Sequence, residues 1–170
     1  MAEQLVPTDD PSPKRRKHIV MILLGIVVAL VLGAVAFLNW QMGSVAGANP
    51  DDPAQVAMGQ AVYQQNCASC HGVKLEGQPD WRVRKQDGRL PAPPHDKTGH
   101  TWHHPDKDLF SITKIGVQPP LAPAGYESDM PPFDDVLSDE EIWAVLSFIK
   151  NSWPSKFRAR QIRKDEASRQ

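Results

Sequence analysis

The sequence predicts a membrane-spanning helix followed by a small helical domain that is rich in loops. Three observations support this fold class. Residues 19–38 contain no charge and no proline, and later segments place apolar residues at helical spacing after capping residues. No stretch shows the alternation of a half-buried strand, and 16 prolines and 11 glycines indicate many loops. With 170 residues, the chain is long enough for one domain plus extensions.

The amino-terminal part predicts a cytoplasmic basic segment over 1–18 and a transmembrane anchor over 19–40. Four basic residues at 14–17 precede the apolar run. Fourteen of the first twenty residues of the anchor are Leu, Ile, Val or Phe, and twenty helical residues span about 30 Å, the thickness of a bilayer core. The alternative is a cleaved signal peptide, because residues 46–48, Ala-Gly-Ala, would suit a peptidase. The positive-inside rule places everything after Trp40 outside the cytoplasm.

Residues 41–52 have the Gly, Ser, Asn and Pro composition of a linker, which at full extension reaches about 40 Å. Asp52 then predicts a helix N-cap, followed by a proline at the first helical position. Gln55 is expected to reach back to the cap in a variant of the capping box. The resulting helix is expected over 53–66. Gly59 inside it costs about 1 kcal/mol, which predicts the close approach of another helix there.

This helix leads into residues 67–71, Cys-Ala-Ser-Cys-His. Two thiols three positions apart, with an imidazole directly after them, predict a covalently bound haem c. Cys67 and Cys70 would form thioethers with the haem vinyl groups, and His71 would ligate the iron. Since the chain has two cysteines, a single haem is expected. Structural zinc would need two further ligands, and a thioredoxin-like pair would need a βαβ context. Histidines occur later, but a second cysteine pair and the βαβ pattern do not.

Two further helices follow. Residues 105–116 begin with Pro-Asp, space their apolar residues as a helix does and end with a glycine stop. Ser138 opens a capping box before an amphipathic run, which predicts a core helix that Pro154 closes. The intervening segments, 72–104 and 117–137, are rich in Pro and Gly. We expect these loops to wrap a haem, which supplies apolar surface that they lack.

Met130 is the candidate for the second axial ligand of the iron. It lies in the segment Asp-Met-Pro-Pro-Phe, whose two prolines stiffen the loop and remove backbone donors. The alternatives are a histidine from 95–104, or Met130 as a gap-filling core residue. The other methionines lie at the terminus, in the membrane span, in the linker and in the helix before the motif: Met1, Met21, Met42 and Met58.

The order of helix, CxxCH motif, loops, helix, Met-Pro and helix resembles a class I c-type cytochrome over residues 53–154, here preceded by an anchor similar to that of membrane-bound bacterial electron carriers. The resemblance implies an all-α cytochrome c fold wrapped on one covalently bound haem. It also implies that the first and last helices of this domain cross near Gly59, Tyr63 and Trp143.

The same resemblance implies His71 and Met130 as axial ligands, with the carbonyl of Pro93 or Pro94 orienting the histidine. The function that it implies is single-electron transfer between respiratory or photosynthetic complexes, on the periplasmic face of a bacterial inner membrane. The partners would be a quinol–cytochrome c oxidoreductase and a terminal oxidase or photosynthetic reaction centre, with no nucleic acid.

Catalysis is not expected, because no nucleophile–base pair or paired carboxylates are visible. The alternatives are a fixed cytochrome subunit of a larger oxidase or dehydrogenase, and a haem- or metal-based sensor or peroxidase.

Residues 99–104, Gly-His-Thr-Trp-His-His, leave more than one role open. Their three histidines could bind copper or zinc, or one could ligate the haem iron. They could also pack around the haem and donate hydrogen bonds to its propionates, with Trp102 and either Arg82 or Arg89 contributing.

Charge is unevenly distributed along the chain. Residues 39–149 carry 8 basic and 15 acidic residues, a net charge of -7, whereas residues 150–170 carry 7 and 2, a net charge of +5. The acidic part could steer association with a basic patch on a redox partner. The basic C-terminal tail, 155–170, is interpreted either as a solvated helix extension or as a segment that lies on anionic lipid or a partner. Its cations include Lys156, Arg158, Arg160, Arg163 and Lys164.

Overall fold

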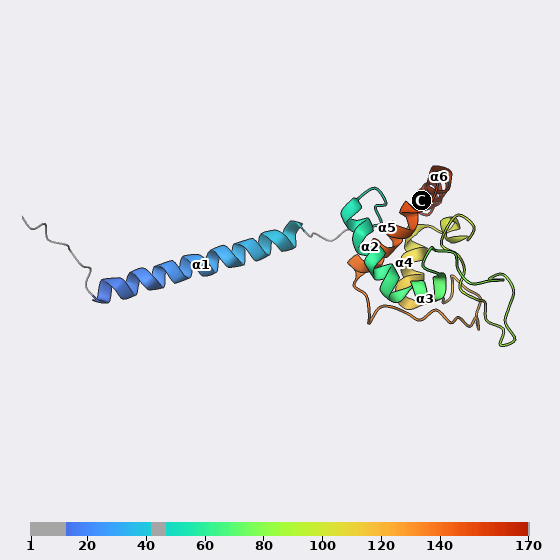
Figure 1. Ribbon diagram of the computed structural model, residues 1–170, viewed down its shortest axis with the longest axis horizontal. Helices are drawn as coiled ribbons and strands as arrows, with labels where there is room; N and C mark the ends of the chain where they lie inside the picture. The colour runs from blue at the N-terminus through green and yellow to red at the C-terminus, as the bar shows by residue number, and fades with distance from the viewer. Residues whose placement is uncertain (1–12, 42–46, 170) are drawn as a thin grey trace, which may run out of the picture. The chain divides into compact units, whose positions relative to one another are not determined.

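The computed structural model describes residues 13–41 and 47–169, in which every regular element is a helix and no strand occurs (Figure 1). The predicted all-α class is therefore confirmed. The chain divides into two units, 1–43 and 44–170, which are described separately. The first twelve residues and 42–46 lie outside the described part, and with them most of the expected cytoplasmic segment, part of the linker, Met1 and Met42.

The first unit contains helix α1 (Pro13–Gln41). Its stretch Lys14–Phe37 is long and apolar enough to cross a membrane, and none of it is buried. Large aliphatic side chains are open on it, with Leu30 67% exposed. A bilayer core is the environment in which such a surface is stable, so α1 is compatible with a single-pass anchor.

The second unit begins with α2 (Pro53–Asn66), whose bounds match the prediction. The Asp52 carboxylate accepts hydrogen bonds from backbone N–H groups of the first turn, as an N-cap does. Gln55 does not close a capping box, so that prediction is wrong. Its Oε1 accepts from the Asn49 N–H and from the Ser147 hydroxyl, each at 2.8 Å. Because Gln55 is buried, its amide serves tertiary contacts instead of the cap.

Helix α5 (Asp139–Asn151) begins at Ser138 with both hydrogen bonds of the predicted capping box. It packs along α2 (Figure 1). A Cβ atom added to Gly59 would lie 1.8 Å from the Ala144 carbonyl oxygen, so the predicted close approach of another helix is confirmed. Nearby, the ring centroids of Tyr63 and Phe148 are 5.3 Å apart.

Helix α4 (Asp106–Ile115) also forms where predicted and ends at Gly116, whose φ of 82° suits a glycine. Two shorter elements carry candidate site residues, α3 (Ala68–His71) and the 3₁₀ turn η1 (Thr101–His103). Apolar side chains of α2, α4 and α5 share one core with residues of the long loops. Its members include Val62, Tyr63, Leu75, Leu109, Phe133, Leu137, Ile142, Val145, Leu146, Ile149 and Trp153.

The last helix, α6 (Ser155–Ala167), packs on the rest of the unit through polar contacts and through Phe157, whose ring centroid lies 4.9 Å from that of Trp102. Gln161 is fully buried, and its Nε2 donates to Asp106 Oδ1 at 2.6 Å. The same carboxylate accepts from Lys150 Nζ at 2.8 and 2.9 Å. The Asp165 carboxylate of α6 accepts a further hydrogen bond from the Asp106 N–H at 3.0 Å. The start of α4, the end of α5 and the middle of α6 are therefore joined at one carboxylate.

Candidate functional site

The motif of residues 67–71 folds into a single tight turn. Cys67 ends α2, where its N–H donates to the Tyr63 carbonyl at 2.9 Å. Its own carbonyl accepts from the N–H groups of Cys70 and His71 at 3.1 and 2.9 Å. The structure therefore brings together Cys67, Cys70 and His71 on one helical turn.

Both cysteines are free thiols, Cys67 partly buried and Cys70 exposed. Burial, and secondarily the neighbouring Cys70, raises the pKa of Cys67 to about 11. Redox-active cysteine pairs show the opposite shift, because their surroundings stabilise the thiolate. The environment of Cys67 therefore does not favour a thioredoxin-like role.

One hydrogen bond fixes the chemistry of His71. Its ring is 7% exposed, and Nδ1 lies 2.9 Å from the Pro93 carbonyl oxygen. Because a carbonyl only accepts, Nδ1 carries the proton and Nε2 keeps its lone pair. Burial lowers the pKa of His71, which favours the neutral ring. A neutral imidazole with a free Nε2 is the form that binds a metal.

The expected hydrogen bond to a proline carbonyl thus forms with Pro93. The next carbonyl, of Pro94, lies against Gly99 instead, where an added Cβ atom would be 1.9 Å from it. On its other side, this loop presses on Gly77, whose added Cβ would lie 2.4 Å from the Pro94 nitrogen. Gly77 also donates its N–H to the His71 carbonyl at 2.8 Å. These two glycines allow the proline segment to lie against the motif.

His95, one of the histidines of 95–104 considered as an alternative ligand, is a neighbour of the motif in a position that the sequence did not predict. Its ring stacks on that of His71, with centroids 4.0 Å apart and planes at 23°. Its Nδ1 is hydrogen-bonded with the Thr101 hydroxyl at 2.8 Å, and its carbonyl accepts from Trp153 Nε1 at 2.7 Å. Burial first, and then the nearby His71 and His100, holds the pKa of His95 well below its ordinary value. Two neutral imidazoles therefore lie face to face here.

Met130 lies in a different loop from the motif, partly buried against the core that Cys67 also contacts. The loop is fastened on both sides of it. Asp129 forms ion pairs with Lys85 and Arg89, each at 2.7 Å. Beyond the prolines, the Phe133 N–H donates to the Lys114 carbonyl at 3.0 Å. Its surroundings hold Met130 in place, but they do not by themselves assign it to the iron.

Comparison with known proteins bears on this arrangement. The family model for cytochrome c matches residues 56–153, more than half of the chain. The chain belongs to the cytochrome c family. Such a domain implies covalently bound haem c, and the spacing of Cys67 and Cys70 fits its attachment motif. Members of the family are generally electron carriers rather than enzymes. No curated protein and no solved structure matches this cytochrome.

The residues of this cytochrome also fit the polar edge of a haem. His100 Nδ1 and Trp102 Nε1 are buried without a hydrogen-bond partner, and both can donate to an anionic group such as a propionate. Of the two arginines considered, Arg82 lies 4.0 Å from the ring centroid of Trp81, which in turn stacks on His100. Arg89 is occupied by Asp129 and Glu127. Among the described residues, no three His, Cys, Asp or Glu side chains are grouped so that they could hold a metal ion.

Proposed function

We propose that this protein is a membrane-anchored monohaem c-type cytochrome. It transfers single electrons between respiratory or photosynthetic complexes on the periplasmic face of a bacterial inner membrane. The observation that carries the proposal is the single turn in which two free thiols precede a buried His71 whose Nδ1–H is held by Pro93. Haem supplies one-electron chemistry, since its iron is stable in both the ferrous and the ferric states.

Each residue of the proposed haem site has a distinct role. Cys67 and Cys70 would hold the haem through thioethers, and His71 would present Nε2 to the iron. Met130 would supply its thioether sulfur to the iron, where it would raise the reduction potential relative to a second histidine. The neutral state of His71 supports this assignment, because proton binding and iron binding compete for the same lone pair.

His100 and Trp102 are assigned to the propionates. Their unpartnered donors are the support, because a buried polar group without a partner is costly and a carboxylate would satisfy both. Arg82 adds positive charge next to Trp81 and His100. In this assignment the His-rich stretch contributes to haem binding and does not form a separate copper or zinc site.

The donor and acceptor are assigned by the resemblance to class I cytochromes. They are a quinol–cytochrome c oxidoreductase and a terminal oxidase or photosynthetic reaction centre. The net charge of -7 over residues 39–149 supports docking on basic patches of such partners, since opposite charges raise the rate of encounter. No nucleic-acid partner is expected.

A fixed subunit of a larger oxidase or dehydrogenase is the alternative. The segment between α1 and α2 has eleven residues, 42–52, and so reaches at most about 40 Å, which suits a domain held beside one membrane complex. Purification of the full chain from its own membranes in mild detergent separates the two functions. A carrier is recovered alone, whereas a subunit retains its partner in fixed stoichiometry.

Covalent haem is tested by acid–acetone extraction of the full chain, produced in a host that matures c-type cytochromes. We expect the pigment to remain with the protein and to show low-spin spectra in both redox states. The double variant Cys67→Ser/Cys70→Ser should lose pigment on extraction, while Ser69→Ala, at an exposed position of the same turn, should keep it. Pigment that washes free of the unmodified protein, or its absence from matured protein, would disprove the proposal.

A further inference from the structure

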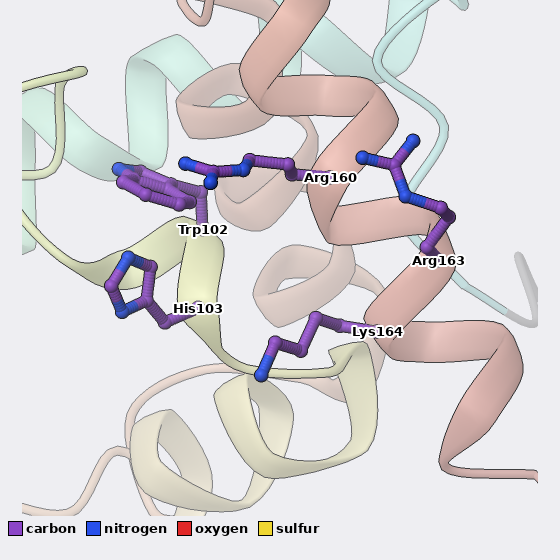
Figure 2. Close-up of a pocket in the computed structure, with 5 residues that line it drawn as sticks. All are labelled: Trp102, His103, Arg160, Arg163 and Lys164. Atoms are coloured by element: carbon purple, nitrogen blue, oxygen red, sulfur yellow. The ribbon is translucent and has the colours of Figure 1, made fainter.

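A groove lies between η1 and α6, and of the residues that line it only Trp102 has a role in the function proposed above. It encloses about 510 Å³ and is lined by Trp102, His103, Arg160, Arg163 and Lys164 (Figure 2). Arg160 reaches from α6 to the ring of Trp102, and Lys164 extends from the same helix toward η1 (Figure 2). A second hollow of about 270 Å³ continues along α6, and Lys156 and Phe157 line it together with Arg160 and Arg163. No carboxylate lines either hollow.

The cations of the groove lack counter-ions. Within the described part of the chain, Arg160, Arg163 and Lys164 take part in none of the side-chain ion pairs. Arg160 instead lies 5.2 Å from the ring centroid of Trp102. Two other cations of the same C-terminal segment are neutralised, Arg158 by Asp51 at 2.7 Å and Arg169 by Asp165 at 2.5 Å. The unneutralised charge is therefore concentrated on one face of α6.

The pKa of His103 is affected by the positive charges that line the groove. This pKa is lowered chiefly by burial and then by the positive charges of Lys164 and Arg160. The contribution of Lys164 and Arg160 to this shift, second to burial, places His103 within the field of both cations. Guanidinium and ammonium groups that converge without a carboxylate suit phosphate oxygens, which accept several charged hydrogen bonds at once.

We propose that the groove between η1 and α6 binds the phosphate groups of anionic phospholipids and so docks the haem domain on the surface of its own bilayer. This inference rests on the membrane anchoring proposed above. The tether of residues 42–52 keeps the domain within about 40 Å of the membrane, so that weak lipid contacts occur at a high effective concentration.

The test is hydrogen exchange of the α6 amides in the haem-loaded full chain, reconstituted into lipid nanodiscs. One set contains phosphatidylcholine alone, and the other also contains phosphatidylglycerol. Docking should slow exchange over 155–167 in the anionic discs, and added salt should reverse the effect. Each lysine or arginine near an anionic surface contributes about fivefold. The double variant Arg163→Gln/Lys164→Gln should therefore lower the docking constant, taken from the ratio of the two exchange rates, about 30-fold.

The matched control is Lys74→Gln/Lys97→Gln, which removes the same charge from exposed positions outside the groove and should keep the protection. Unchanged absorption spectra show that each variant has folded around its haem. Equal exchange in the two lipids, or equal loss of protection in both double variants, would overturn the docking site.

Two soluble probes test the other occupants, both in phosphatidylcholine discs. If glycerol phosphate alone protects α6 as well as anionic lipid does, the groove is a site for free phosphate and the bilayer assignment is wrong. If poly-glutamate protects α6 and anionic lipid does not, the groove serves an acidic protein partner. Failure of anchoring is seen separately, because the chain would then fail to assemble with discs of either composition.

Discussion

At His71 a backbone carbonyl decides which ring nitrogen is available. The acceptor belongs to Pro93, so no side-chain substitution at that position removes it directly. Its placement depends instead on Gly77 and Gly99, against which the proline segment lies with no room for a Cβ atom. The orientation of the proposed ligand is therefore determined by loop packing on both sides of the motif.

Replacement of Met130 by alanine tests the second axial ligand. We expect Met130→Ala to abolish the methionine–iron charge-transfer band of the oxidised protein and to lower the midpoint potential, since the thioether ligand raises it. Optical spectra and a potentiometric titration measure both effects. Met58→Ala is the matched control, because Met58 is 41% exposed on α2, and it should leave the spectra unchanged. Unaltered spectra in Met130→Ala would move the assignment to a histidine of 95–104 or to an open iron position.

His95 makes stability depend on pH. Because burial holds its pKa well below the ordinary value of about 6.5, the unfolded chain binds a proton below that pH that the folded chain excludes. The contribution of His95 is thus fully present above about pH 6.5 and is lost as the pH falls, by up to about 1.4 kcal/mol per pH unit. His95→Gln should reduce this slope when urea unfolding is followed from about pH 7.5 to 5.5.

His103→Gln is the comparison for that measurement, because the pKa of the largely exposed His103 is lowered less than that of the buried His95 and its replacement should change the slope less. Equal slopes in His95→Gln and the unmodified protein would show that the buried ring is protonated at no cost, contrary to this account.

At the scale of the element, the crossing of α2 and α5 depends on one missing side chain. Gly59→Ala places a methyl group against the Ala144 backbone, which cannot yield as a side-chain end would. We expect this overpacking to lower the free energy of unfolding by about 3 kcal/mol, despite the better helix propensity of alanine. Denaturant unfolding of the haem-loaded protein measures it. Gln60→Ala, at the exposed neighbouring position, should stay within about 0.5 kcal/mol. Equal stability of the two variants would contradict the crossing.

The elements differ in how far the sequence predicts them. Helices α2, α4 and α5 form where expected, because caps and apolar periodicity are local signals. The packing of α6 could not be predicted in the same way. Phe157 is partly buried against the core, but the one fully buried side chain of α6 is that of Gln161, and Asp165 adds a tertiary hydrogen bond. Both are polar residues that in sequence indicate a solvated surface. The capping role assigned to Gln55 failed for a related reason, since a local rule cannot foresee a hydrogen bond to Ser147.

The features of the site also differ in how far the sequence predicts them. The spacing of Cys67, Cys70 and His71 lies within one turn and can be read directly from the sequence. The stacking of His95 on His71 depends on a loop of more than twenty residues that must first close, and no local pattern encodes that closure. The choice of Pro93 over Pro94 likewise follows from how the loop packs on glycines.

At the scale of the whole molecule, separate tasks are proposed for the two units. The residues assigned to the haem all lie in residues 44–170, and the membrane-length helix lies in residues 1–43. The full chain should therefore float with phosphatidylcholine vesicles, while a chain that starts at Ser44 should remain in solution with the same absorption spectrum. Density-gradient flotation measures both. A full chain left in the soluble fraction, or a spectrum altered by removal of 1–43, would contradict this division.

The uneven charge of the chain has a practical consequence for its purification. A formal net charge of -1 suggests a protein that binds weakly to either type of ion exchanger, yet residues 39–149 carry a net charge of -7 and residues 150–170 a net charge of +5. Ion-exchange resins bind local patches of charge. At neutral pH and low ionic strength, an anion exchanger can therefore retain the protein through residues 39–149, and a cation exchanger can retain it through residues 150–170. The salt concentration at which each resin releases the protein would then depend on the charged stretch that it binds, and the net charge of the whole chain would not predict it.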